Sequence, residues 1–468
     1  MNKNIEDVYS EIRADLQGAL LRPGDLDYGR AAPVWNGMFD RRPALLARCK
    51  DVTDIQTCLR AARGSRVITA VRCGGHSLAG FSTCDDGLVI DLSALRSVRV
   101  DGSARKARFG GGCLLGTIDS ATQTAGLAFP AGVVSHTGAG GLVLGGGTGW
   151  LSRLYGLSCD NVEGFTLITA DGSVLRADSK ENPDLFWALR GGGGNFGVVT
   201  EFEVRLYPVS SVILGRGLCV RDSIVPLLQY WRAFMPDAPD NLRWGFSLRN
   251  GDGVKGLQDA KGLQDAKGLP VASTSALWVG DRTHGMKYVE HALAATKHRD
   301  VSIQEMSFMT LQTLADSDFP HGRRYYTKSG YFQTLRDGVI HKMIESLATM
   351  PSKFSEIELA YLGAAPGRVA ADETAFGDRS APFVVNILSN WEAANDDAAN
   401  LAWTRDLFNQ LRPAMVPGVY VNFMSGDEGD RVPEAYRNRW ERLRAIKAKY
   451  DPRNFFCLNQ NIPPQETT

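Results

Sequence analysis

The chain has 468 residues, of which 44% are hydrophobic and 22% charged, and its 52 basic side chains balance 52 acidic ones. This length predicts two or three domains, and a formal charge of zero without a basic stripe argues against nucleic-acid binding. No apolar run approaches a membrane span and residues 1–8 lack the apolar core of a leader, so we expect a cytoplasmic protein without a membrane partner.

The cysteines are scattered along the chain, and none belongs to a C-x-x-C pair or to a Cys/His cluster with zinc spacing. We therefore expect reduced thiols, mostly buried as small apolar groups, and no metal site.

Short helices and strands alternate over the first two hundred residues. Helical spacing predicts helices over residues 5–20 and 51–63, the second capped by Asp51. Strands are predicted near residues 41–49 and 87–92, followed by a hairpin over residues 98–109. The pattern indicates an α+β fold.

The first glycine cluster, RCGGHSLAG, covers residues 72–80. Gly74 and Gly75 can adopt backbone angles that a Cβ would forbid, and they let consecutive N–H groups close around an anion. We predict a pyrophosphate cradle, with the Arg72 charge at its rim and the Ser77 hydroxyl as a further donor. His76 would point from the cradle toward the rest of the ligand; the alternative is a hydrogen-bonding loop histidine.

A second glycine cluster, FPAGVVSHTGAGGLVLGGGTGW, covers residues 129–150. It has neither helical nor strand period and is too apolar for a solvent loop, which favours backbone packed against a flat apolar ligand. Residues 192–197 match G-x-G-x-x-G, but a helix precedes them and a strand follows, the reverse of a nicotinamide-binding Rossmann site. The sequence around Ser77 lacks the last glycine of a hydrolase elbow.

From residue 208 the glycine runs stop, and apolar strands alternate with amphipathic helices to about residue 405. Residues 255–260 repeat at once as 261–266, which predicts a tolerated loop duplication. Residues 355–361 alternate, so Glu356 and Glu358 share one strand face; two adjacent carboxylates on a buried face would raise the pKa of one of them. The alternative is an exposed edge strand.

The last segment, from residue 418, resembles the first two hundred residues in its pattern of short elements. Residues 418–423 predict a strand, residues 435–450 a helix, and residues 454–464 an extended tail rich in side-chain amides. Such amides suit the hydrogen-bonding edge of a heterocycle.

Taken in order, these motifs resemble one family closely. They include Trp35-Asn36, the segment 72–77, the cluster 129–150, the segment 186–193 and the tail with Asn459 and Asn461. The chain is similar to FAD-linked oxidases with a vanillyl-alcohol-oxidase-type (PCMH-type) FAD domain, within the berberine-bridge-enzyme-like group and its bacterial 6-hydroxy-D-nicotine-oxidase-like branch. Each motif alone is weak, but their order is specific.

The resemblance implies an FAD-binding domain in two parts, residues 1–207 and 406–468. Between them it implies an inserted substrate domain, residues 208–405, in which helices cover an antiparallel sheet. It further implies a single covalent bond from His76 to the flavin 8α-carbon, since Val134 stands where many members have a second, cysteinyl tether. Cys159 is not at the matching place and is expected to be structural. Further FAD contacts are implied at Arg72, Cys73, Gly74, Gly75, Ser77, Gly80, Thr137, Gly138, Gly140, Gly141, Leu144, Gly145, Val199, Asn459 and Asn461.

By resemblance the chain is an oxidase of a small organic molecule. A C–OH or C–N substrate would pass a hydride to flavin N5, and O₂ would take the electrons. Glu358 is the preferred proton acceptor, and the other candidates for the catalytic side are Glu356, Tyr331, Tyr420 and Asn422. In the alternative interpretation the tyrosines are half-buried sheet residues.

A flavin-dependent oxygenase or oxidative cyclase acting on a polyketide-like substrate, and a non-catalytic small-molecule binder, remain as alternatives. We expect a monomer or a homodimer.

Overall fold

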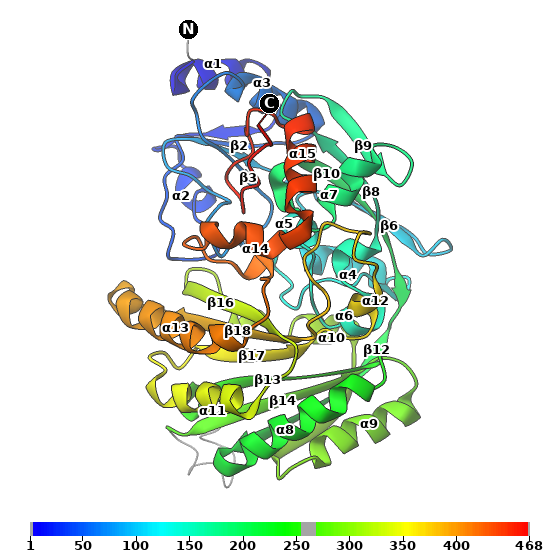
Figure 1. Cartoon of the computed structure of the whole chain (residues 1–468). Coiled ribbons are helices and arrows are strands. Elements are labelled where there is room, and N and C mark those ends of the chain that lie inside the picture. The colour runs from blue at the N-terminus through cyan, green and yellow to red at the C-terminus, as the bar shows by residue number, and fades with distance from the viewer. Residues whose placement is uncertain (1–2, 254–267, 467–468) are drawn as a thin grey trace.

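The structure is a computed structural model that describes residues 3–253 and 268–466. Figure 1 shows two small sheets with their helices at one end and a large sheet with its own helices at the other. The repeat at residues 255–266 lies outside the described residues.

The first sheet is built from the N-terminal segment. Its strand order is β1-β2-β4-β3, with β3 and β2 parallel to β4 and β1 antiparallel to β2. The strands are β1 (Ala19–Leu21), β2 (Leu45–Arg48), β3 (Thr69–Arg72) and β4 (Leu88–Asp91), and the helices of this region are α1 (Ile5–Asp15), α2 (Tyr28–Ala31) and α3 (Val52–Ala62). Asp51 caps α3 as predicted, because its carboxylate accepts from the N–H groups of Thr53 and Asp54.

The second sheet is fully antiparallel, in the order β5-β6-β10-β8-β9. Its strands are β5 (Val98–Asp101), β6 (Lys106–Gly110), β8 (Val162–Ile168), β9 (Val174–Asp178) and β10 (Val198–Arg205), so the hairpin prediction is confirmed. A short pair joins β7 (Leu127–Ala128) to β11 (Tyr207–Pro208). The helices along this stretch are α4 (Leu115–Gln123), α5 (Ala139–Leu144), α6 (Ser152–Tyr155) and α7 (Pro183–Leu189).

A seven-stranded antiparallel sheet follows, in the order β15-β12-β14-β13-β17-β18-β16. The strands are β12 (Ser211–Val220), β13 (Leu242–Asn250), β14 (Pro270–Trp278), β15 (Arg299–Ser307), β16 (Arg324–Phe332), β17 (Glu356–Tyr361) and β18 (Phe383–Trp391). The helices inserted between them are α8 (Ile224–Phe234), α9 (Arg282–Ala294), α10 (Phe308–Gln312), α11 (Asp337–Ser346) and α12 (Ala365–Arg368), and α13 (Asp397–Leu411) follows β18.

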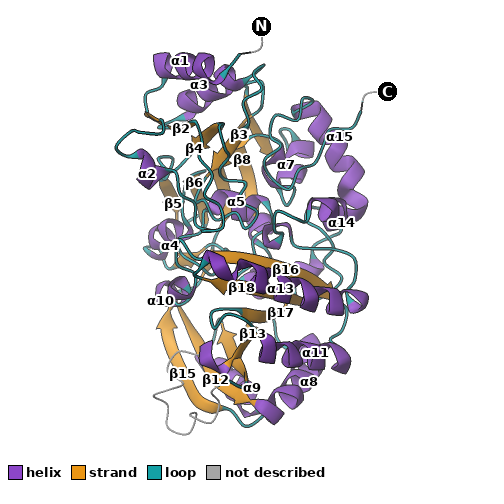
Figure 2. Ribbon diagram, turned by 90° about the vertical axis from the view of Figure 1, so that its left-hand side faces the viewer, coloured by secondary structure: helices purple, strands orange, loops and turns teal. Residues whose placement is uncertain are grey.

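The two faces of this sheet differ in chemistry because side chains alternate along each strand. Ile357, Leu359, Val385 and Ile387 point to one face and pack in a core with residues of α8, α9, α11 and α13. Figure 2 shows α8, α9 and α11 on the side of this sheet that faces away from the two smaller sheets. The opposite face, toward the two smaller sheets, carries the polar residues of the site. The predicted boundary at residue 405 falls inside α13, which packs against β16 and β18.

The C-terminal segment returns to the N-terminal half, as Figure 1 shows. It contains α14 (Val432–Tyr436) and α15 (Trp440–Tyr450) rather than the one helix predicted over residues 435–450, because the backbone takes a positive φ of 50° at Arg437. Tyr450 of α15 donates to Asp184 of α7. The predicted α+β fold, with an antiparallel sheet covered by helices between two parts of one domain, is confirmed.

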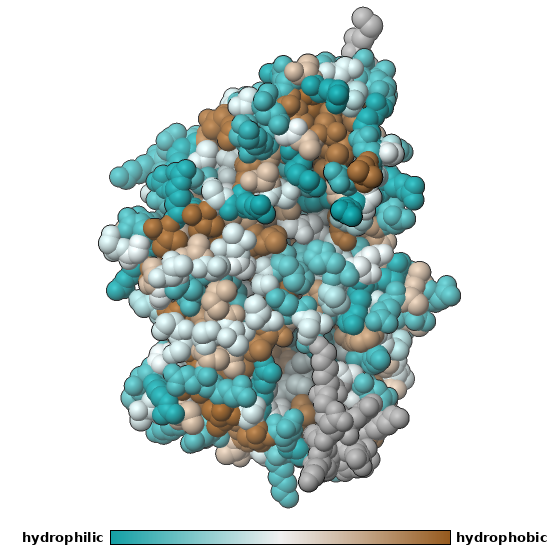
Figure 3. Space-filling view, turned by 180° about the vertical axis from the view of Figure 1, so that it is seen from behind, coloured by the Kyte–Doolittle hydropathy of each residue, from teal (hydrophilic) through white to brown (hydrophobic). Residues whose placement is uncertain are grey.

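Within the described residues, no helix combines the length and apolarity needed to cross a membrane. Seen from behind, the surface is mostly hydrophilic, and its apolar residues gather in separate patches (Figure 3).

Candidate active site

A cavity of about 440 Å³ lies where the three regions meet. One wall consists of the two glycine clusters, and a second is the polar face of the seven-stranded sheet. Further lining comes from residues 193–199 and from the tail at residues 456–460. All the segments that the sequence singled out for ligand binding therefore contribute to one space.

The first glycine cluster begins where β3 ends, and its backbone packs directly on the second cluster. A Cβ on Gly74 would lie 2.4 Å from the Gly138 backbone nitrogen, and a Cβ on Gly138 would lie 2.3 Å from that of Gly74. Gly75 has a φ of +71°, a conformation that favours glycine. Around Gly141 the Cβ position has no atom within 4 Å, which leaves open space beside the backbone.

Most of the predicted cofactor residues line this cavity. They are Cys73, Gly74, Gly75, His76, Ser77, Thr137, Gly138, Gly140, Gly141, Leu144, Val199 and Asn459. Although the sequence of the second cluster has no helical period, residues 139–144 form the short helix α5.

The structure places Arg72 differently from the prediction. Its buried guanidinium donates to the backbone oxygens of Ala31, Ala32 and Ser82, and Arg72 is not part of the cavity lining. The Arg72 guanidinium therefore binds neighbouring backbone and does not lie at the rim of the predicted pyrophosphate cradle. Gly80 also lies outside the lining, where its Cβ position falls on the Phe39 ring.

His76 is held at the cavity wall by two neighbours. Its Nε2 lies 2.8 Å from Nδ1 of His136, and its ring stacks on Trp35 with centroids 4.6 Å apart. Burial, together with the nearby His136 and His321, lowers the pKa of His76 to about 2, so its imidazole is neutral. A neutral imidazole keeps a lone pair for bond formation.

His136 and His321 were not among the predicted site residues. The ring nitrogens of His76, His136 and His321 lie within 4.8 Å of one another, although the three residues are far apart in the sequence. The only sequence signal for His136 was its place inside the second glycine cluster.

The tail is anchored through Asn195, which the sequence analysis did not select. The Asn195 amide donates to the Gln460 backbone oxygen, and its Oδ1 accepts from the Ile462 N–H. Nearby, the side-chain oxygens of Asn459 and Asn461 are buried without a hydrogen-bond partner in the described part of the chain. Asn461 itself does not line the cavity. The Asn459 oxygen fits a ligand that supplies an N–H donor, as a flavin or adenine ring does.

Glu358 is the carboxylate on the opposite wall. It lies on β17, an interior strand between β13 and β18, so the exposed-edge alternative is wrong. Its side chain is 39% exposed, toward the cavity, and lies 4.0 Å from the Arg243 guanidinium. Burial and then the charge of Glu356 raise the pKa of Glu358, while Arg243 and a hydrogen bond from Asn386 oppose the rise.

Glu356, the second predicted candidate base, does not line the cavity. Its carboxylate pairs with the Arg249 guanidinium at 2.6 Å and accepts a hydrogen bond from the Ser247 hydroxyl. The charge of Glu356 nevertheless acts on Glu358, as the sequence predicted, because it contributes to the raised pKa of Glu358.

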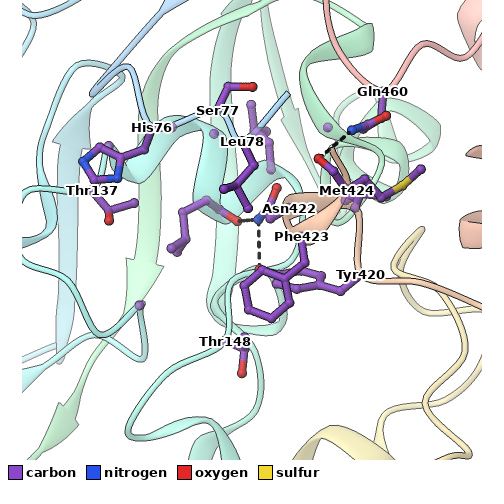
Figure 4. A pocket seen from close by; sticks show the side chains of 18 of the residues that line it. His76, Ser77, Leu78, Thr137, Thr148, Tyr420, Asn422, Phe423, Met424 and Gln460 are labelled. Carbon is purple, nitrogen blue, oxygen red and sulfur yellow. Dashed lines mark hydrogen bonds between the residues drawn. The ribbon is translucent and has the colours of Figure 1, made fainter. Parts of the chain in front are cut away.

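Tyr420 and Asn422 lie across the cavity from His76 and Thr137 (Figure 4). The Tyr420 hydroxyl oxygen accepts from the Gly147 N–H and from the Asn422 amide, both at 2.9 Å. Burial raises the pKa of Tyr420 to about 12 and that of Tyr331 still further. Both phenols are therefore protonated near neutrality.

The predicted strand at residues 418–423 is wrong, because residues 421–423 form a single turn of 3₁₀ helix. Asn422 also donates to the Leu142 backbone oxygen. Gly145 lies behind this contact, where its Cβ position is 2.1 Å from Asn422 Oδ1, and it does not line the cavity. Cys159 is buried in a cluster with Tyr331 and Tyr420 and lies outside the lining, as expected.

Comparison with known proteins shows the family of this chain. An FAD binding domain model matches residues 43–178, and a model described as berberine and berberine like matches residues 419–463. An FAD-linked oxidoreductase of Dictyostelium discoideum is 30% identical over 98% of this chain and 97% of that protein. The (R)-6-hydroxynicotine oxidase of Paenarthrobacter nicotinovorans is 41% identical over 42% of this chain and 43% of its own length.

Solved structures give the same result. The 6-hydroxy-D-nicotine oxidase of Arthrobacter nicotinovorans superimposes with a TM-score of 0.85 and 28% identity, covering 96% of this chain and 99% of that chain. A berberine-bridge-enzyme-like protein of Physcomitrella patens superimposes with a TM-score of 0.87 over 98% of this chain and 100% of its own, at 23% identity, which bears on the fold alone. The chain belongs to the berberine-bridge-enzyme-like family of FAD-linked oxidoreductases.

Proposed function

We propose that the protein is an oxidase that carries FAD on His76 and oxidises a small organic molecule at a C–OH or C–N bond, with O₂ as electron acceptor. The observation that carries this proposal is the position of a neutral His76 at the cavity wall beside both glycine clusters, with Glu358 on the facing wall. The same arrangement supports a cofactor between them and a substrate against the sheet.

Bound FAD would supply a hydride acceptor that O₂ can reoxidise. His76 would fix the ring system by its bond to the 8α-carbon, and the glycine backbones would carry the diphosphate. The buried amide oxygen of Asn459, which lines the cavity, would accept from a ring N–H group. The open space beside Gly141 would leave room for the cofactor next to this backbone.

Glu358 would take the proton from the substrate O–H or N–H as the hydride leaves the carbon. It is the best acceptor among the candidates because Glu356 is paired with Arg249 and the two tyrosines are protonated. A carboxylate with a raised pKa is a stronger base than an exposed glutamate. The Tyr420 hydroxyl already accepts two hydrogen bonds, so its own proton is available to orient a substrate oxygen or nitrogen.

Acid precipitation of purified protein tests the tether. We expect yellow colour to stay in the pellet, and the intact mass to exceed that of the polypeptide by FAD less the hydrogen lost on bond formation. His76→Ala should release its flavin into the supernatant. A colourless pellet and an unmodified mass for the wild-type protein would contradict the tether.

Anaerobic mixing with sugars, alkaloids and polyketides tests the oxidation. Bleaching of the flavin by one class identifies the substrate class, and readmitted air should then restore the yellow colour with release of hydrogen peroxide. A label from ¹⁸O₂ in the organic product would contradict the oxidase assignment and favour an oxygenase.

A further inference from the structure

Two histidines, His76 and His136, are in contact at the cavity wall. Nε2 of His76 lies 2.8 Å from Nδ1 of His136. Nδ1 of His76 has no hydrogen bond within the described residues. The two nitrogens of this imidazole are therefore not equivalent, because one is engaged by a neighbour and the other is free.

We propose that His136 is the proton acceptor for the covalent attachment of FAD to His76. This inference rests on the tether proposed above. It requires Nε2 of His76 to carry the ring proton, which is the tautomer that donates to Nδ1 of His136. The lone pair of Nδ1 is then free to attack.

Attachment of FAD to His76 forms one bond and breaks two. A bond forms between Nδ1 of His76 and the 8α-carbon, and one C–H bond of that methyl group breaks. Attack at Nδ1 makes the imidazole cationic, so its Nε2–H bond breaks and the proton passes to Nδ1 of His136. The methyl proton goes to solvent, and the C–H electron pair passes into the isoalloxazine, which is thereby reduced by two electrons and takes up two protons from solvent. O₂ then removes these two electrons and two protons as hydrogen peroxide, which restores the oxidised ring.

The surroundings fit this role. Trp35 stacks on His76 and Tyr325 on Trp35, with interplanar angles of 14° in both pairs, which fixes the plane of the attacking ring. The low pKa of His76 leaves its imidazole unprotonated before attack. His136 is only half-buried, so it can release the proton to solvent.

The loop that carries His136 is itself held in place. Asp316 accepts from the backbone N–H of Ser135 at 2.8 Å and from its hydroxyl at 2.6 Å. Both carboxylate oxygens of Asp316 are thus engaged by the residue next to His136. The hydrogen bond between the two histidines is part of an anchored arrangement.

The rate of covalent FAD incorporation into apoprotein tests the proposal, because it needs no substrate. FAD is added to wild-type, His136→Gln and His321→Gln proteins, and flavin in the acid-precipitated protein is followed over time at several FAD concentrations. Glutamine can accept a hydrogen bond but cannot take up the proton. His321 is the matched control, since its ring lies 5.5 Å from that of His76 and makes no hydrogen bond with it in the described residues.

We expect His136→Gln to lower the limiting rate by about 10²-fold or more, the usual contribution of a general base. The FAD concentration that gives half this rate should stay unchanged, and His321→Gln should tether at the wild-type rate. Magnetic resonance of the flavin peptide should place the bond at Nδ1.

Three outcomes would overturn the proposal alone, namely wild-type tethering in His136→Gln, equal slowing in both variants, or a bond at Nε2. A wild-type protein that never tethers FAD would instead remove the tether on which the proposal rests.

Discussion

Replacement of Glu358 by glutamine tests the assignment of the base. Glutamine keeps the volume of the side chain and its hydrogen-bonding capacity beside Asn386, but it cannot accept a proton at neutral pH. Among the described residues that line the cavity, Glu358 is the only carboxylate, and Tyr331 and Tyr420 are protonated. The loss should therefore equal the whole contribution of a general base, about 10²–10⁴-fold in rate, which corresponds to about 3–5 kcal/mol of activation free energy.

The assay is anaerobic stopped-flow bleaching of the bound flavin with whichever substrate class reduces the wild-type protein. We expect the limiting rate of bleaching to fall while the half-saturating substrate concentration changes little. In the wild-type protein the rate should rise with pH through the pKa of Glu358, because the base must be ionised. The midpoint should lie above the ordinary pKa of a glutamate, about 4.3, and this limb should vanish in the variant.

Glu356→Gln is the matched control for the same experiment. Its carboxylate lies outside the cavity, so its bleaching rate on the alkaline plateau, expressed per bound flavin, should match that of the wild type. If Glu358→Gln bleaches as fast as the wild type and keeps its pH limb, Glu358 is not the base.

Three further predictions follow from contacts near the site. Arg243→Met removes the charge that lowers the pKa of Glu358, so the pH limb of flavin bleaching should move to higher pH; movement to lower pH would refute this electrostatic account. Gly145→Ala puts a methyl group 2.1 Å from Asn422 Oδ1 and should cost about 2 kcal/mol in denaturant unfolding, since two hydrogen bonds of that amide are displaced; unchanged stability would argue against the contact. Lys447→Met leaves the charge of its fully buried partner Asp451 unpaired and should lower the free energy of unfolding by about 3–5 kcal/mol. A loss below about 1 kcal/mol would show that this ion pair adds little to stability.

The sequence predicted those features of the structure that depend on residues close to one another in the chain. The Asp51 cap of α3 follows from a carboxylate placed just before a helical pattern. Gly74 was selected because it lacks a side chain, and the structure adds that its Cβ would strike the Gly138 backbone. The family resemblance gave the two-part domain with its inserted sheet, which no periodicity in the sequence specifies.

The errors share one cause, which is that long-range contacts decided the outcome. Arg72 has no sequence neighbour to indicate that its guanidinium binds the backbone oxygens of Ala31 and Ala32. The alternation at residues 418–423 favours a strand, yet the Tyr420 hydroxyl bonds to Gly147 and the chain makes a tight turn there. The contact of His136 with His76 spans 60 positions and leaves no spacing signal.

The anchoring of the tail by Asn195 has a consequence for biosynthesis. The Asn459 oxygen suited to the cofactor comes from the tail, whereas the cradle comes from residues 72–80. A ribosome must therefore complete the large sheet and both terminal helices before the two halves of the cofactor cavity can meet. Capture of FAD by a nascent chain is therefore expected only after residue 459 has been made, and a chain that stalls inside the sheet would offer the nucleotide only half of its binding surface.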